Sequence, residues 1–183
     1  MKYQDYLKAT QECIDQVSEE TIEEFIQYLQ RAKDEGGRLF FIGVGGSAAN
    51  CSHAVNDFRK IGNIDALTPL DNVSELTAYI NDLNFEDCIA KSLETSRFGW
   101  NDTLIVFSVG GGSENTSKNI VKAIDYAKKQ GSPILGIVSR DGGYTKKHAD
   151  VCIHFCPSDP SMITPIAESL QVVFWHYMVN KIC

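Results

Sequence analysis

Short and almost continuous runs of apolar residues alternate along the chain with longer segments of helical periodicity. Five runs rich in β-branched or aromatic residues predict buried strands: RLFFIG from residue 38, NIDAL from 63, TLIVFS from 103, PILGIVS from 133 and VCIHFC from 151. The segments between and after them predict helices at 48–60, 74–83, 115–130, 144–148 and 165–182. This alternation predicts an α/β domain with a doubly wound five-stranded parallel sheet, covered by helices on both faces.

The first 36 residues carry a different pattern, because they show helical periodicity with no strand. The first helical piece begins near Tyr3 and ends near Val17. The second opens with Thr21 and Glu24 in capping-box spacing and closes at a pair of glycines. No linker, repeat or low-complexity segment follows, so residues 1–183 are predicted to form a single domain with an N-terminal helical extension.

Composition and charge narrow the range of partners. The chain has 183 residues with ordinary globular composition, and its net charge is −7. Nucleic-acid and membrane-surface binders usually present a basic face, so we expect neither of these partners. The N-terminus lacks a signal-peptide apolar core, and no apolar stretch is long enough to span a bilayer. With six scattered cysteines read as reduced thiols, the sequence predicts a cytoplasmic protein.

Two glycine-rich turns follow the first and third predicted strands. They read GVGGSA at 43–48 and SVGGGSEN at 108–115, and each leads from a strand into a helix. Glycine lets the backbone approach a ligand, while serine hydroxyls and the free amides of a helix start bind anions. One such turn often serves packing alone. Two of them at the carboxyl edge of one sheet predict a shared ligand site.

The details of these turns exclude a nucleotide cofactor. The first lacks the third glycine of a dinucleotide fingerprint, and no acidic residue ends the second strand in the expected way. Neither turn is followed by the Gly-Lys-Ser/Thr sequence of a Walker loop. The remaining interpretation is a site that binds a single phosphate group.

Four motifs in order resemble the sugar isomerase (SIS) domain and, within it, the phosphoheptose isomerases. They are GVGGSAANCSH from residue 43, NDLNFE at 81–86, SVGGGSEN from 108, and a histidine in the last helix. The resemblance covers essentially the whole chain and implies a flavodoxin-like sheet. It also implies an enzyme that converts sedoheptulose 7-phosphate to D-glycero-D-manno-heptose 7-phosphate.

The resemblance implies a set of residues for each part of the substrate. The hydroxyls that bind the phosphate would be those of Ser47, Ser108 and Ser113. The backbone amides that bind it would be those of Gly45, Gly46, Gly110 and Gly111. The sugar hydroxyls would be contacted near Asp71 and Asn72.

The same resemblance implies an acid–base pair and a metal set. Asp57 stands where the family has glutamate, and with His176 it would form the catalytic pair. His53, Asp57, Glu168 and His176 would be the ligands of a divalent metal such as zinc, with Glu168 at the position of a family glutamine. His53 and Asp57 are four residues apart and therefore share one helical face. Isomerisation through an enediol requires such a pair to move protons, and a metal can polarise the two oxygens.

The last helix also bears on assembly. Glu168 and His176 are eight residues apart, so about 12 Å of helix separates them. We therefore expect each site to borrow a residue from a neighbouring subunit. The resemblance implies a homotetramer in which the helices of residues 1–36 help to bury the contact.

Some positions depart from the family and leave other functions open. Val44 replaces an asparagine and Gly110 replaces a usual serine. Two alternatives follow: a non-catalytic phosphosugar-binding or replication-initiator-associating module, or an isomerase for a different phosphosugar. The residues also have plainer interpretations, with His53 on an exposed helix face, His176 in packing, and Asp141 opening a simple turn.

Overall fold

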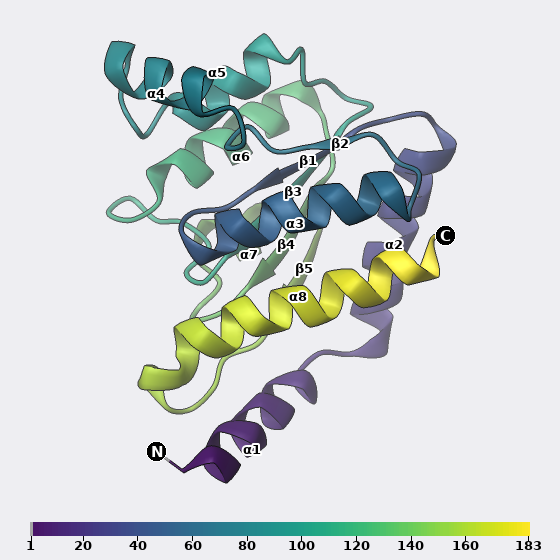
Figure 1. Ribbon diagram of the computed structural model, residues 1–183, viewed down its shortest axis with the longest axis vertical. Helices are drawn as coiled ribbons and strands as arrows, with labels where there is room; N and C mark the ends of the chain where they lie inside the picture. Colours follow the sequence, from purple (N-terminus) through teal and green to yellow (C-terminus); the bar gives the residue numbers. More distant parts are fainter. Residues whose placement is uncertain (1) are drawn as a thin grey trace.

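The computed structural model describes residues 2–183 and contains one sheet of five parallel strands (Figure 1). The strand order is β2-β1-β3-β4-β5. This is the flavodoxin-like doubly wound order, which confirms the predicted fold class. The strand bounds are β1 Leu39–Ile42, β2 Ala66–Leu67, β3 Thr103–Ser108, β4 Ile134–Val138 and β5 Val151–His154.

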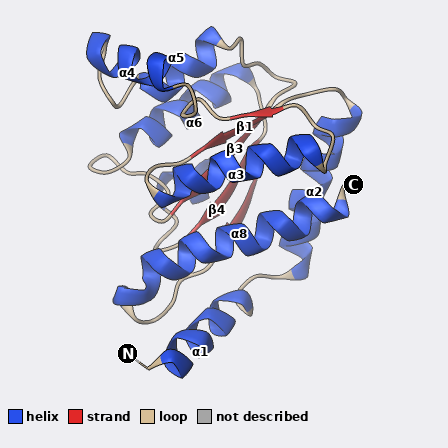
Figure 2. Cartoon of the chain, in the orientation of Figure 1, coloured by secondary structure: helices blue, strands red, loops and turns tan. Residues whose placement is uncertain are grey.

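Both faces of the sheet are buried, because successive side chains of each strand enter two different cores. Leu39 and Phe41 of β1 pack on one face, whereas Phe40 and Ile42 pack on the other. Figure 2 shows the helices that cover the sheet. The first face carries α2 (Glu19–Asp34), α3 (Gly46–Lys60) and α8 (Ile163–Lys181), and the second carries α4 (Val73–Asp82), α5 (Cys88–Thr95) and α6 (Lys118–Gln130).

The N-terminal helix α1 (Tyr3–Ile14) lies at the periphery of the fold in Figure 1 and packs the partly buried Tyr6, Ala9 and Ile14 against the core of the first face. Cys13 is its one buried residue. After the helix, the side chain of Gln16 donates to the carbonyl of Cys156 at 3.2 Å and accepts from its amide at 2.9 Å. The two predicted N-terminal helices are therefore confirmed, and the first leaves most of its surface exposed.

Three elements differ from the pattern-based prediction. Helix α6 begins at Lys118 rather than near residue 115, because the Ser113 hydroxyl accepts amide hydrogens of the next turn and Ser117 has a left-handed φ of 55°. Helix α5 has no counterpart among the predicted helices. Strand β2 has only two residues and pairs with Leu39 and Phe40.

The topology places a crevice at the carboxyl ends of β1 and β3. From β1 the chain proceeds outward to β2 and then returns to β3 on the other side, so the connections diverge between β1 and β3. Ligands bind at such switch points in open α/β sheets. Within residues 2–183, no helix is long and apolar enough to cross a membrane.

Candidate active site

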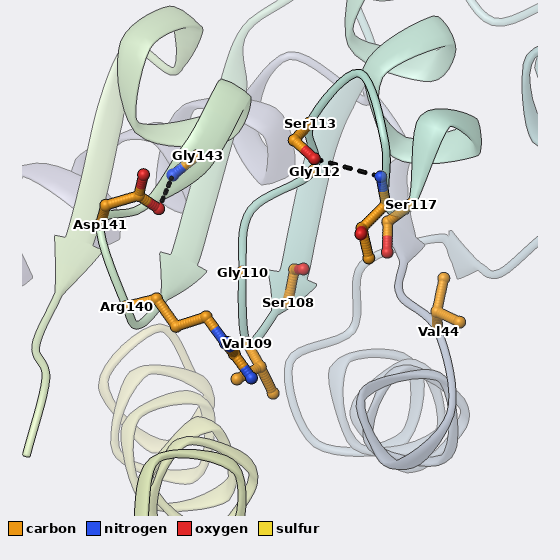
Figure 3. Close-up of a pocket in the computed structure, with 11 residues that line it drawn as sticks. Val44, Ser108, Val109, Gly110, Gly112, Ser113, Ser117, Arg140, Asp141 and Gly143 are labelled. Carbon is orange, nitrogen blue, oxygen red and sulfur yellow. Dashed lines mark hydrogen bonds between the residues drawn. The ribbon is translucent and has the colours of Figure 1, made fainter. Parts of the chain in front are cut away.

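A cavity of about 550 Å³ lies at the carboxyl ends of the central strands (Figure 3). Its walls come from the loops after β1, β3 and β4, as the topology predicts. The lining residues are Val44, Ser108, Val109, Gly110, Gly112, Ser113, Thr116, Ser117, Arg140, Asp141 and Gly143.

The loop after β3 is shaped to present hydrogen-bond donors to this cavity. The hydroxyl of Ser108 accepts from the amide of Gly111 at 3.0 Å, and that of Ser113 accepts from the amide of Thr116 at 3.1 Å. Each serine therefore keeps its own O–H proton to donate. Within residues 2–183, the amides of Gly110 and Gly112 have no hydrogen-bond acceptor. Free amides and hydroxyls around one hollow suit an anion such as phosphate.

This loop is held in place by the loop after β4 and the short helix α7 (Gly143–His148). The carbonyl of Gly111 accepts from the amide of Thr145 at 2.9 Å and from its hydroxyl at 2.7 Å. The carbonyl of Gly112 accepts from the amide of Tyr144 at 2.8 Å. The contact is so close that a Cβ added to Gly111 would lie 2.0 Å from the carbonyl oxygen of Gly142.

The first glycine turn contributes less to the cavity than the sequence predicts. Gly45, Gly46 and Ser47 lie at the start of α3, but none of them lines the cavity. Ser47 is 1% exposed, and its hydroxyl accepts from the side-chain amide of Gln171 at 3.1 Å. In this chain the hydroxyl of Ser47 therefore joins α3 to α8. Only Val44 of this turn reaches the cavity wall.

Asp71 and Asn72 also lie outside the cavity wall, and both have local partners. The carboxylate of Asp71 accepts a hydrogen bond from the hydroxyl of Ser52 on α3. The side chain of Asn72 caps α4 by accepting from the amide of Glu75 at 3.3 Å. Their position near sugar hydroxyls stays a prediction from the sequence.

A second chemical centre forms where α3 packs against α8. Oδ2 of Asp57 lies 3.7 Å from Nε2 of His53 and 3.4 Å from Nε2 of His176. Asp57 is buried, while the side chains of His53 and His176 are about half exposed. The indole of Trp175 packs against both imidazoles, with its ring centroid 3.6 Å from that of His176. Packing alone therefore does not explain His176, because its imidazole faces a carboxylate.

Neighbouring groups orient the two proposed catalytic side chains. Asn56 donates to Oδ1 of Asp57 at 2.8 Å and leaves Oδ2 facing the histidines. Nδ1 of His176 donates to the carbonyl of Val172 at 2.9 Å. This hydrogen bond directs Nε2 toward Asp57. The neutral imidazole Nε2 and the carboxylate oxygen both have lone pairs that can bind a cation.

The three side chains also fit a divalent metal. Their ligand atoms all lie within 4.8 Å of one another. Donors bound to tetrahedral zinc are roughly 3.3 Å apart, so small side-chain rotations suffice. Two imidazoles and a carboxylate with one open position match the usual donor set of catalytic zinc. Glu168 is not in this cluster, because its carboxylate packs against Gly46 at the start of α3.

Several cavity residues were missed by sequence reasoning. The helical pattern predicted from residue 115 includes Thr116 and Ser117, but both residues precede α6 and form the cavity wall beside Ser113. Asp141 does open a turn, since its side chain accepts from the amide of Gly143, and this turn is also part of the cavity. Arg140, in the loop after β4, also lines the cavity. The available signal was a basic residue followed by a glycine turn at the carboxyl end of a central strand.

Comparisons with known proteins agree with this arrangement. The profile of the SIS domain family matches residues 2–139. A phosphoheptose isomerase from Helicobacter pylori (strain Shi470) is 30% identical over 164 residues, covering 86% of this chain and 80% of that protein. A phosphoheptose isomerase from Rhodospirillum rubrum is 28% identical over 153 residues, covering 80% and 76%.

Solved structures show the same fold. A phosphoheptose isomerase from Francisella tularensis superposes with a TM-score of 0.85 at 20% identity, covering 98% of this chain and 93% of that one. The phosphoheptose isomerase GmhA from Neisseria gonorrhoeae gives a TM-score of 0.84 at 22% identity, with 98% and 94% covered. The chain therefore belongs to the SIS domain family and, within it, to the phosphoheptose isomerases.

Proposed function

We propose that this protein isomerises sedoheptulose 7-phosphate to D-glycero-D-manno-heptose 7-phosphate. The observation that carries the proposal is the cluster of His53, Asp57 and His176. This cluster lies farther along α3 than the end of the helix that faces the cavity side of the sheet. His53 is seven residues beyond the start of α3, a rise of about 10 Å. In the substrate, the phosphate and the reacting carbons likewise lie at opposite ends of the sugar.

The proposed chemistry uses the cavity for binding and the cluster for proton transfer. Ser108, Ser113 and the free amides of Gly110 and Gly112 bind the phosphate and fix the sugar chain. One member of the pair formed by Asp57 and His176 removes the proton from the carbon next to the carbonyl and returns it to the neighbouring carbon. The other moves the proton between the two oxygens. General acid–base catalysis of this kind contributes about 10² to 10⁴-fold.

A zinc ion is proposed as the metal of this site. His53, Asp57 and His176 would hold it, and the hydrogen bond from His176 to Val172 supports this role by orienting the ring. When bound, the ion would polarise the carbonyl and hydroxyl oxygens of the substrate. The interpretation as a cation site also explains why two imidazoles converge on one buried carboxylate.

We also propose a homotetramer in the cytoplasm, with the helices of residues 1–36 in the contact. Two features support an assembly. Tyr3 and Leu7 of α1 and Val173 and Tyr177 of α8 are exposed apolar side chains. The imidazole of His176 also lies at the surface of the isolated chain, so a neighbouring subunit can close the site. Sedimentation equilibrium tests the assembly, and a monomer at micromolar concentration would contradict it.

The activity is tested by NMR of sedoheptulose 7-phosphate in deuterated water, with and without zinc. We expect deuterium at the carbon next to the carbonyl with the parent protein and its absence with His176→Ala. A His148→Ala variant is the matched control, because His148 bonds to Lys128 at a distance from the cluster. Binding of the sugar phosphate without any exchange in the parent protein would refute this isomerisation and favour a binding module or an isomerase for a different phosphosugar.

A further inference from the structure

Arg140 is the one cationic side chain among the described residues that line the cavity. It lies two residues beyond the end of β4 at Val138, and Figure 3 shows its side chain extending toward Val109. The chain has 17 lysines and arginines against 24 acidic residues, so its overall charge would repel an anionic ligand and a cation in the cavity counters this locally.

The guanidinium of Arg140 has no partner within residues 2–183, because it takes part in none of the ion pairs or side-chain hydrogen bonds there. The carboxylate beside it, Asp141, is directed to the amide of Gly143 at 3.2 Å (Figure 3). Arg38 gives a contrast, since its guanidinium donates to the carboxylate of Asp102 and to the carbonyls of Ser96 and Arg97. The charge of Arg140 is thus left available to a ligand.

The backbone of Arg140 is held in an uncommon conformation. Its φ is 53°, in the left-handed region that non-glycine residues rarely adopt. Nε2 of His154 on β5 donates to the Arg140 carbonyl at 2.9 Å, while Nζ of Lys146 donates to Nδ1 of the same ring at 3.1 Å. Strained residues persist where the surroundings fix them, and they cluster at ligand sites. The hydrogen bonds from Lys146 to His154 and from His154 to the Arg140 carbonyl therefore help to hold the backbone of Arg140.

The stem of Arg140 lies beside Gly110 in the loop after β3. A Cβ built on Gly110 would be 3.6 Å from Cδ of Arg140, which is ordinary van der Waals contact. The stem of the arginine therefore packs on the same backbone whose amides at Gly110 and Gly112 are free. Cation and amides converge on one part of the cavity.

We propose that Arg140 binds the phosphoryl group of the substrate and that His154 is a positioning residue for it. This inference rests on the proposed function. A guanidinium offers parallel N–H donors that match two phosphate oxygens, and a charged hydrogen bond is about twice as strong as a neutral one. Together with the hydroxyls of Ser108 and Ser113, Arg140 closes the cradle from the β4 side.

Steady-state kinetics of Arg140→Ala and Arg140→Lys tests the proposal, with Arg97→Ala as the matched control. Arg97 is also an exposed arginine with a φ of 54°, but it lies outside the cavity. We expect Arg140→Ala to raise KM about 10- to 100-fold while kcat changes little. Arg140→Lys should recover part of the loss, and Arg97→Ala should match the parent. A KM for Arg140→Ala equal to that of Arg97→Ala would overturn the proposal.

His154→Ala tests the positioning role. We expect a smaller rise in KM than for Arg140→Ala, and no further rise when the two substitutions are combined, because both act through the same guanidinium. Additive effects of the two substitutions would overturn the role of His154.

Protection from thermal unfolding by inorganic phosphate separates this inference from the proposed function. If the parent protein fails to isomerise the sugar but phosphate raises its melting temperature in an Arg140-dependent way, the inference stands and the proposed function fails. If the parent isomerises the sugar and Arg140→Ala keeps both KM and phosphate protection, the inference fails alone.

Discussion

Replacing Gly111 with alanine perturbs the contact between the two loops that form the cavity. Gly111 has a φ of 68°, and an added Cβ would lie 2.0 Å from the carbonyl oxygen and 2.6 Å from the carbonyl carbon of Gly142. Both atoms belong to backbone, so no side chain can rotate away. The loops after β3 and β4 must separate to accept the methyl group.

The expected loss in the free energy of unfolding follows from the interactions that this separation breaks. A left-handed backbone costs alanine about 1–2 kcal/mol. Moving the loops apart also removes the hydrogen bonds from Thr145 to the Gly111 carbonyl and from Tyr144 to the Gly112 carbonyl, each worth about 1 kcal/mol. We therefore expect the free energy of unfolding to fall by roughly 3–5 kcal/mol, together with loss of phosphate protection.

Gly131→Ala is the matched control for this substitution. Gly131 has a similar φ of 73°, but a Cβ there would meet nothing within 4 Å. Gly131→Ala should therefore lower the free energy of unfolding only by the cost of a left-handed backbone, about 1–2 kcal/mol. Urea unfolding followed by circular dichroism, at equal protein concentration, measures both variants. Equal losses for Gly111→Ala and Gly131→Ala would refute the argument that the loops are in steric contact.

Three further predictions concern the rest of the fold. Asp102→Ala should lower the free energy of unfolding in urea by about 3–5 kcal/mol. The reason is that the buried Asp102 carboxylate accepts from the guanidinium of Arg38 at 2.8 and 2.9 Å. A loss below about 1 kcal/mol would contradict this. Burial raises the pKa of Cys152 from 9.0 to about 11, so the unfolded thiol ionises first and stability should fall between pH 9 and pH 11. A Cys152→Ala variant should lose this part of the alkaline decline in unfolding titrations. Burial also raises the pKa of Cys51, so iodoacetamide should label the exposed Cys183 well before Cys51. Peptide mass spectrometry measures the two labelling rates, and equal rates would contradict the burial of Cys51.

Much of the fold and part of the site follow from local sequence patterns. The apolar runs predict the strands because a strand buried on both faces must be apolar at nearly every position. Ser108, Gly110 and Ser113 reach the cavity because they directly follow a central strand. His53 and Asp57 face each other because four residues make about one helical turn.

Other parts depend on partners that are distant in the chain. Whether the Ser47 hydroxyl faces a ligand or the core is decided by Gln171, which lies 124 positions away on α8. The side chain of Arg140 lines the cavity beside Gly110, while His154, 14 positions along the chain, holds the Arg140 carbonyl. None of these contacts has a periodicity or a spacing that a single sequence reveals.

The sequence alone determined the class of fold, the two glycine turns and the pairing of His53 with Asp57. Propensity, periodicity and helical spacing act over a few residues, and those features need nothing more. The tertiary structure decided that α8 brings His176 within 3.4 Å of Asp57 and leaves Glu168 elsewhere. It did so because the position of one helix on another is set by the packing of the whole core, to which residues from every part of the chain contribute.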